Sequence, residues 1–341
     1  MTTSKHVVSE ALSPSGGQHL TEKLRSLAQR PAQVPLREVI DRYMQVYAGR
    51  DTSRGQRLAA WCALLGDFTL EQLDADLVHA AREELARQPA LTFKGLDFDG
   101  RQIFRAKEGR TAKTPSTLNK YIAALGAVCT WAIDQRIAPR GWPHPCRGVR
   151  RLREPDGRVR YLEPDERERL LAACKLSRYP RLYAFTLTAL LTGARRGELL
   201  GLRWRDIELP DQPNAEGAAY LARSKNGDRK ALVLLPAVVA ALRPFVGDRD
   251  RFVFGSVGSK FQRPAVLDTA WREAVQRAGL TDWRFHDCRH DFASRMVQAG
   301  VDLAVVAECL GHRQLTMTRR YAHLKTATRA QAMRTALGGE G

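Results

Sequence analysis

A stretch of prolines and arginines near the middle of the chain limits what this sequence can fold into. Proline cannot continue a helix, so the helical pattern that precedes the stretch must end there. Arginines follow at a density that keeps a segment extended through self-repulsion. The helix-ending residues are Pro139, Gly141, Pro143 and Pro145, and the arginines are Arg147, Arg150, Arg151, Arg153, Arg158 and Arg160. We therefore expect two domains joined by a basic linker at residues 146–160, a division that suits a chain of 341 residues.

The part before the linker is expected to be a helical bundle. Residues 1–32 mix Ser, Thr, Gly, Gln and Pro without apolar periodicity, and we expect a flexible arm there. Residues 33–145 carry apolar side chains at helical spacing, which predicts helices at about 36–47, 57–65, 71–87 and 116–136. Between the last two, residues 92–113 are rich in Gly, Lys and Arg and lack a clear period. This insertion is expected to be an exposed loop or small hairpin.

The part after the linker, residues 161–341, is also expected to be mostly helical. Pro164 and the acids around it are typical of a helix start, and residues 181–191 are apolar nearly all round, as in a buried central helix. Short strands are predicted at 206–209, 219–222 and 231–235, the last two flanking the turn-forming pair Asn226 and Gly227. The predicted fold class is therefore mainly α with a small antiparallel β-sheet.

The charge of the chain favours a polyanionic partner. Its 55 Lys and Arg exceed its 37 Asp and Glu, giving +18 and a pI near 10.1. Residues 101–160 alone hold fourteen Lys or Arg against four acids. The plainer explanation of this charge is a solvated surface with a basic bias, but binding to nucleic acid is favoured over it. Binding to a membrane surface is disfavoured because no long basic amphipathic helix is evident. The sequence contains no apolar run of ~20 residues, no signal peptide and no Cys-x-x-Cys spacing. We therefore expect a cytoplasmic protein whose cysteines are reduced thiols.

Four separated segments carry residues that suit phosphate chemistry. In order along the chain they are Thr192-Gly193-Ala194-Arg195-Arg196-Gly197-Glu198-Leu199, then Ser224-Lys225-Asn226-Gly227, then His286-Asp287-Cys288-Arg289-His290, and finally Leu310-Gly311-His312 with Tyr321-Ala322-His323-Leu324. Together they resemble the boxes of the tyrosine recombinase family, of the phage-integrase type, from about residue 160 to residue 324. Cys288 departs from the leucine more usual in that box, a difference expected to affect packing and not chemistry.

The resemblance implies a role for each residue that matches a box. Arg195, not Arg196, would be the first active-site arginine, with Arg289 as the second; His286 and His312 would be the active-site histidines. Lys225 would be the hairpin lysine, and Tyr321 the nucleophile. Beside these, the spacing of three places Glu198 to hold the Arg195 guanidinium, and His290 is expected to support the site structurally.

These residue types fit attack on a phosphodiester. Two guanidiniums, on Arg195 and Arg289, stabilise the charge that develops on the phosphate oxygens. A phenol with a pKa near 10 needs a proton acceptor, which we expect to be His286. The leaving 5′ oxygen needs a proton donor, which we expect to be Lys225. The product would be a 3′-phosphotyrosyl bond, made without ATP or metal, because the sequence shows no Gly-rich phosphate loop and no carboxylate cluster for Mg²⁺.

The resemblance also implies an assembly on DNA. A SAM-like core-binding domain and the catalytic domain would form a C-shaped clamp on double-stranded DNA, and four protomers would act on two DNA segments through a Holliday junction to integrate or excise a mobile element. The tail at 324–341 carries an apolar stripe and is expected to dock on a neighbouring protomer, although an internal helix is the simpler interpretation. Candidate DNA contacts are Lys113, Lys120, Arg147, Arg150, Arg151 and Arg153.

Other interpretations stay open at this point. Taken singly, each candidate residue has a plain structural explanation, and His286, Cys288, His290 and His312 suggest a zinc site, although their spacings are unusual for one. A type IB topoisomerase would use similar Arg, Lys and Tyr chemistry. A non-catalytic DNA-binding regulator would keep the fold without the reaction. The order of the four boxes favours the recombinase.

Overall fold

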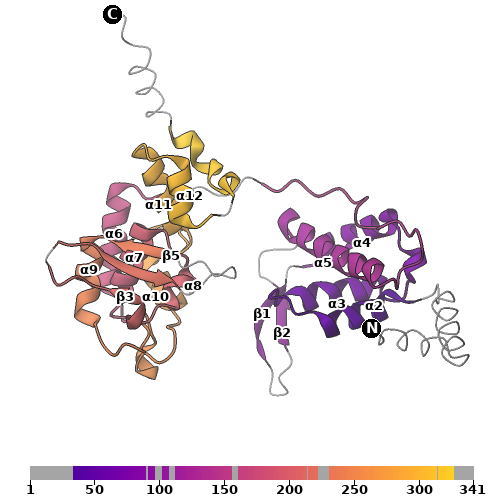
Figure 1. Ribbon diagram of the computed structural model, residues 1–341, viewed down its shortest axis with the longest axis horizontal. Coiled ribbons are helices and arrows are strands. Elements are labelled where there is room, and N and C mark those ends of the chain that lie inside the picture. Colours follow the sequence, from indigo (N-terminus) through magenta and orange to yellow (C-terminus); the bar gives the residue numbers. More distant parts are fainter. Residues whose placement is uncertain are drawn as a thin grey trace, which may run out of the picture. The chain divides into compact units, whose positions relative to one another are not determined.

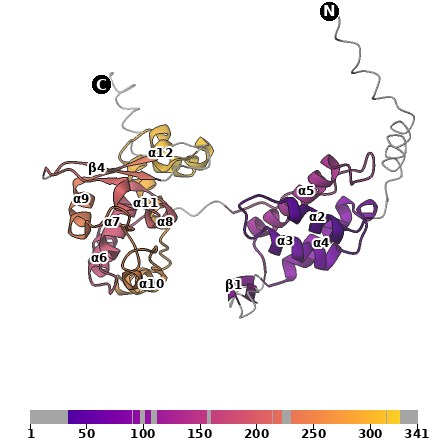
Figure 2. The ribbon, with the colours of Figure 1, turned by 60° about the horizontal axis from the view of Figure 1, so that its bottom comes forward.

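The computed structural model describes residues 34–89, 91–96, 102–106, 112–155, 160–212, 214–221, 230–312 and 314–325. The chain divides into two compact units, Met1–Asp156 and Gly157–Gly341. Helices gather around a separate core in each unit (Figures 1 and 2). The predicted arm, Lys225 with its turn, and the tail after Lys325 lie outside the described residues. None of the helices within these ranges is long and apolar enough to span a membrane.

In its described residues, the first unit is a bundle of four helices with one short 3₁₀ turn. Its helices are α2 (Leu36–Val46), α3 (Arg54–Leu65), α4 (Ala75–Arg87) and α5 (Pro115–Asp134), and the turn is η2 (Leu70–Gln72). The helix predicted at 71–87 is in fact interrupted, because the Asp74 side chain accepts a hydrogen bond from the Leu77 N–H at 2.8 Å and so starts α4 afresh. Trp61 is fully buried and donates its indole N–H to the Tyr121 carbonyl at 2.9 Å, which joins α3 to α5.

A two-stranded hairpin lies between α4 and α5. Its strands β1 (Leu91–Leu96) and β2 (Gln102–Ala106) are antiparallel, with a register shift between Phe93 and Gly95. The sequence predicts either an exposed loop or a small hairpin for this insertion. The part of it that forms strands is a hairpin.

The second unit is built around α7 (Leu182–Thr192), which is buried over almost its whole length. Leu, Phe and Ala side chains face its neighbours, and the buried hydroxyls of Thr188 and Thr192 donate to the backbone carbonyls of Ala184 and Thr188 at 2.7 and 2.6 Å. The apolar pattern therefore predicted this central helix correctly. Around it lie α6 (Pro164–Lys175), α8 (Arg196–Leu200), α9 (Pro236–Leu242), α10 (Asp268–Arg277), α11 (Asp287–Gln298) and α12 (Leu303–Leu310).

A three-stranded antiparallel sheet completes the second unit. Its strands, in spatial order, are β3 (Ile207–Glu208), β4 (Gly217–Leu221) and β5 (Lys230–Leu234). Ala219 pairs with Ile207 on one side and with Leu232 on the other. The fold class expected from the sequence, mainly α with a small antiparallel sheet, is confirmed.

The first half of the predicted linker is packed against the first unit. Val149 is buried and Leu152 lies against the same core. The Asn119 side chain on α5 accepts from the Leu152 N–H and donates to the Leu152 carbonyl, both at 2.9 Å, and it also donates to Glu154 at 2.8 Å. Charge repulsion between the arginines led us to expect an extended segment here. Apolar contacts and these hydrogen bonds instead hold its first half against the first unit.

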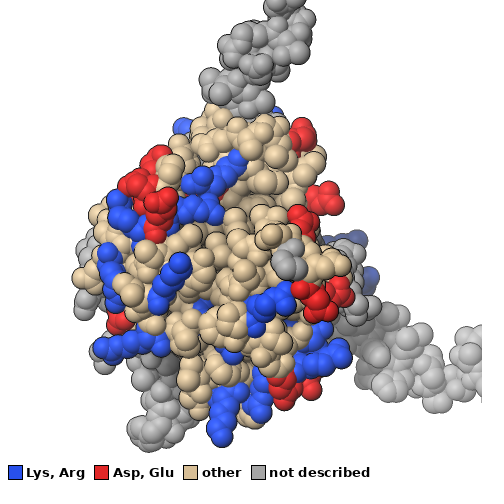
Figure 3. Space-filling model, turned by 90° about the vertical axis from the view of Figure 1, so that its left-hand side faces the viewer, with Lys and Arg blue, Asp and Glu red and all other residues tan. Residues whose placement is uncertain are grey.

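Basic residues are spread over the surface of the second unit. On the face shown in Figure 3, Lys and Arg side chains alternate with acidic and uncharged ones instead of forming one continuous patch. Several arginines of this unit are paired with acids, among them Arg196 with Asp268 at 2.8 Å and Arg205 with Asp250 at 2.6 Å. The excess of positive charge is therefore not concentrated on this face.

Candidate active site

Six of the predicted site residues meet around one small cavity in the second unit. Its volume is about 150 Å³. Arg195, His286 and Arg320 are exposed at its edge, whereas Arg289, His290 and Tyr321 are buried. Residues more than 120 positions apart are therefore neighbours in the fold. The lining consists of Arg195, His286, Arg289, His290, His312, Met317, Arg320 and Tyr321.

Arg195 is held at the start of α8 by Glu198. Gly193 ends α7 with φ +63°, which turns the chain so that Arg195 caps the next helix. A side chain at Gly193 would come within 2.6 Å of the Phe292 ring, so the turn requires glycine. Glu198 accepts from the Arg195 backbone N–H at 2.8 Å and from its guanidinium at 2.6 Å. Arg195 thus keeps a fixed guanidinium at the cavity.

Arg196 points elsewhere. Its guanidinium donates to both oxygens of Asp268, at 2.8 and 3.1 Å, and it lines a different pocket beside α10. Arg195, by contrast, lines the cavity that holds Tyr321. Only Arg195 of this adjacent pair faces the other candidate residues.

Arg289 is almost completely buried on α11. Its guanidinium donates to the Gly193 carbonyl at 2.8 Å and to the Leu310 carbonyl at 2.6 Å. These bonds tie the ends of α7 and α12 to α11. Burial, together with the nearby charge of Arg195, lowers the pKa of Arg289 to about 10, so it remains a cation at neutral pH.

Tyr321 on η7 (Arg319–Lys325) is 2% exposed, and its hydroxyl lies 2.5 Å from His290 Nδ1. Burial lowers the pKa of His290 to about 4, with a further contribution from His286, so this imidazole is neutral at pH 7. Burial also raises the pKa of the Tyr321 phenol, which is therefore protonated. A protonated phenol beside a neutral imidazole donates its hydrogen bond to the ring nitrogen.

His286 occupies a different place from the one expected for the proton acceptor. It lies at the N-terminus of α11, exposed at the edge of the cavity, and its ring meets the His290 ring edge-on with centroids 5.2 Å apart. Burial and the nearby Arg289 lower its pKa. The side chain in hydrogen-bond contact with the Tyr321 hydroxyl is His290, one helical turn further along.

His312 follows Gly311, which ends α12 with φ +63°. Its Nδ1 lies 2.8 Å from the hydroxyl of Thr318, a fully buried residue. Burial and the charge of Arg289 lower the pKa of His312 to about 4. The histidine is thus oriented by Thr318 and neutral, with its ring in the cavity lining.

A lysine that the motifs did not single out also reaches this region. Lys225 lies outside the described residues, but Lys230, the first residue of β5, has its ammonium shielded from solvent near Gly311. No feature of the sequence marks Lys230 apart from its position at the end of the predicted hairpin. The sequence predicts only a supporting role for His290, because its contact with Tyr321 arises from tertiary folding.

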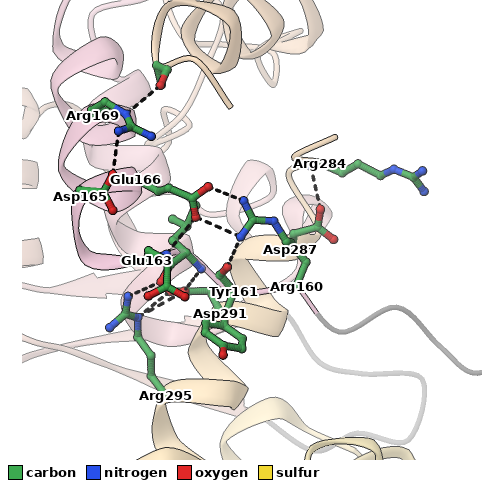
Figure 4. A network of polar contacts seen from close by, with 12 residues as sticks. Arg160, Tyr161, Glu163, Asp165, Glu166, Arg169, Arg284, Asp287, Asp291 and Arg295 are labelled. Carbon is green, nitrogen blue, oxygen red and sulfur yellow. Dashed lines mark hydrogen bonds and ion pairs between the residues drawn. The ribbon is translucent and has the colours of Figure 1, made fainter. Parts of the chain in front are cut away.

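A polar network fixes α11 to the start of the second unit (Figure 4). Asp291 is fully buried; its carboxylate accepts from the Leu162 N–H at 2.9 Å and from Arg167 and Arg295, each at 3.2 Å. The Arg160 guanidinium beside it in Figure 4 binds both oxygens of Glu166. The segment that enters the unit is thereby attached to the helix that carries Arg289 and His290.

The candidate DNA contacts fall into two groups. Lys113 is buried and donates to the carbonyls of Leu85, Gln88 and Pro89 at 3.1, 3.2 and 3.4 Å. These carbonyls lie at the end of α4, so Lys113 caps that helix and is not free for a phosphate, contrary to our expectation. The others are exposed: Lys120, Arg147, Arg150, Arg151 and Arg153.

The geometry does not favour the zinc alternative. Cys288 is buried in the main core of the second unit, and His290 and His312 are hydrogen-bonded to Tyr321 and Thr318. Within the described ranges, no group of three or more His, Cys, Asp or Glu side chains is placed to hold a metal ion.

Comparison with known proteins identifies the family of the chain. Residues 160–328, most of the second unit, match the model of the phage integrase family. The chain belongs to the tyrosine recombinase family. Over 288 residues this tyrosine recombinase is 29% identical to the integrase of Salmonella phage P22, and the match covers 79% of this chain and 70% of that one. The resemblance inferred from the four boxes is confirmed.

Solved structures share the fold of this tyrosine recombinase. A Tn1549 transposon integrase in complex with a circular intermediate DNA has a TM-score of 0.63 at 16% identity, covering 88% of this chain and 99% of that one. A lambda integrase tetramer bound to a Holliday junction has a TM-score of 0.61 at 19% identity, covering 89% and 80%.

Proposed function

We propose that this site-specific tyrosine recombinase breaks and rejoins DNA through a covalent bond between Tyr321 and the 3′ phosphate of the cleaved strand. The observation that carries the proposal is the convergence of Arg195, Arg289 and three histidines on the cavity that holds Tyr321. A phosphodiester is an anion, and the guanidiniums offer donors to the charge that develops on its oxygens during attack. His312, oriented by Thr318, contributes a further hydrogen bond.

The proton of Tyr321 passes to His290 as the phenolic oxygen attacks phosphorus. The Tyr321 O–P bond forms, the bond from phosphorus to the 5′ oxygen breaks, and Lys225 protonates the leaving oxygen. A phosphate in the cavity offsets the charges of Arg289 and Arg320, which are among the causes that lower the pKa of His290. DNA binding therefore makes His290 a stronger base. His286, at the rim, donates to the phosphate.

The reverse reaction joins strands. A 5′ hydroxyl from a second DNA attacks the phosphotyrosyl bond and releases Tyr321. The phosphotyrosyl bond keeps the energy of the broken phosphodiester, so no ATP is consumed and no metal ion is required. Two such exchanges between paired sites pass through a Holliday junction, which requires four protomers; a lambda integrase of similar fold forms a tetramer on such a junction. In this proposal the two units close on double-stranded DNA, and the tail after Leu324 docks on a neighbouring protomer.

A nicked suicide DNA substrate tests the covalent step. We expect the full chain, in EDTA and without ATP, to form an adduct that resists detergent, and Tyr321→Phe to form none while still binding DNA. Equal cleavage by Tyr321→Phe would contradict the proposal. Absence of any adduct from the wild type on its cognate site would support a non-catalytic DNA-binding protein, and relaxation of supercoils without exchange between two sites would support a topoisomerase.

A further inference from the structure

Lys230 carries a buried ammonium beside the candidate active site, outside the residues that line its cavity. Its side chain lies along Gly311: an added Cβ on that glycine would be 3.4 Å from Lys230 Cδ and 3.6 Å from Nζ. The Nζ atom is shielded from solvent and has no hydrogen-bond partner in the part of the chain that the structure describes. Burying an ammonium without a hydrogen-bond partner costs folding free energy, and such a group in a native structure usually has a specific role.

The surrounding charges leave this ammonium uncompensated. Burial lowers the pKa of Lys230 to about 8, with Glu198 opposing the shift and Arg289 and Arg195 adding to it. Glu198 is already bonded twice by Arg195. No ion pair within 4.0 Å joins Lys230 to Glu198 or to another acid among the described residues. Among the described residues, three cations therefore share one carboxylate, and this part of the site is short of negative charge.

We propose that Lys230 binds the phosphate on which Tyr321 acts, as a second active-site lysine besides Lys225. The inference rests on the proposed function and names one more residue of that site. An incoming phosphodiester supplies both the missing negative charge and the missing acceptor, and a compact ammonium binds phosphate as a point charge. The contact with Gly311 places Lys230 next to His312, whose pKa the lysine's charge also lowers.

Two alternative roles for Lys230, support of the fold and protonation of the leaving oxygen, predict different experimental results. A lysine that only supports the fold would destabilise the free protein when replaced. A lysine that protonates the leaving 5′ oxygen would become dispensable when that oxygen is replaced by sulfur, since a thiol has a pKa near 8.5 and a thiolate leaves without protonation. A phosphate-binding lysine remains necessary with either leaving atom.

Thermal unfolding of the full chain, with and without inorganic phosphate, is the first measurement. Lys230→Met keeps the length of the side chain and removes its charge. We expect its Tm without phosphate to be higher than that of the wild type, and the rise in Tm on adding phosphate at constant ionic strength to be smaller. Lys175→Met, at an exposed lysine on α6, is the matched control and should leave the phosphate response unchanged. A lower Tm with an unchanged phosphate response would overturn the proposal.

Adduct formation on the suicide substrate is the second measurement. We expect Lys230→Met to form the Tyr321 adduct roughly 10²-fold more slowly, the effect of removing one donor to a developing oxyanion, and Lys230→Arg to recover most of the rate. With a 5′-bridging phosphorothiolate, Lys225→Met should recover and Lys230→Met should not. A wild-type rate for Lys230→Met, or its rescue by sulfur, would refute the inference. The proposed function would survive either result as long as the wild-type adduct depends on Tyr321.

Discussion

Two of the three histidines that line the cavity, His286 and His290, belong to the same helix start but have different surroundings. His290 is buried, neutral and in hydrogen-bond contact with the phenolic oxygen at 2.5 Å, whereas His286 is exposed at the rim. Charged or titratable groups that face His290 come from its own helix (His286, Asp287 and Arg289) and from η7 (Arg320 and Tyr321). The other helices packed against α11 are α7, which contains no charged residue, and α12, whose Glu308 is exposed. A proton leaving Tyr321 thus has His290 as its nearest acceptor.

Replacement of His290 should change how the cleavage rate depends on pH. We expect His290→Ala to slow adduct formation by about 10²-fold or more at pH 7, since general base catalysis contributes about that much. Burial raises the pKa of the phenol above 10, so the deficit should shrink steadily as pH rises and more Tyr321 ionises. Adduct formation from pH 6 to pH 10 in single-turnover assays measures this. His290→Asn keeps a polar group but takes up no proton; a full recovery by this variant would show that His290 acts only by orientation.

At the scale of elements, the site depends on how α11 is anchored. This helix carries Arg289 and His290 on the side of the cavity and Asp291 on the side of the chain segment that enters the unit. Asp291 has no exposed surface, and its partners come from α6, from α11 itself and from Leu162. One carboxylate thus connects the end of the linker to the catalytic helix.

Removal of that charge should destabilise the second unit strongly. We expect Asp291→Asn to lower the free energy of unfolding by about 3 kcal/mol, because it leaves Arg167 and Arg295 without a buried counter-charge. Denaturant titration measures the change. The matched control is Asp165→Asn, which breaks an exposed pair with Arg169 and should cost about 0.5 kcal/mol or less. Similar losses for the two variants would show that the buried network contributes little.

For the whole molecule, the charge of +18 is informative about function only when its distribution is known. In the second unit many arginines are paired with acids, and the face in Figure 3 carries both signs. In the first unit and the adjoining linker, Lys120 and several arginines are exposed, whereas Lys113 is occupied by carbonyl groups. The count of basic residues therefore overestimates the number of phosphate contacts.

The salt dependence of DNA binding should distinguish the two lysines of the first unit. If Lys120 contacts a phosphate, Lys120→Ala should reduce the slope of log affinity against log salt concentration by about 0.9. Lys113→Met should leave the slope unchanged and instead lower the stability of the first unit by about 1–3 kcal/mol, because three carbonyls at the end of α4 lose their donor. Fluorescence anisotropy at several salt concentrations and thermal melts measure these effects. A reduced slope for Lys113→Met would show that Lys113 does contact a DNA phosphate.

The sequence by itself determined the helices, the central position of α7, the strands of the small sheet and the family, because apolar periodicity and the order of short motifs are local properties. It also pointed to Tyr321 and Arg195. Only the tertiary structure decided which histidine meets the phenol, that Lys113 caps a helix, and that Lys230 lies unpaired beside Gly311. These contacts join residues as much as 81 positions apart, from Lys230 to Gly311. Their pairing follows from how the helices pack, which spacing along the chain does not encode.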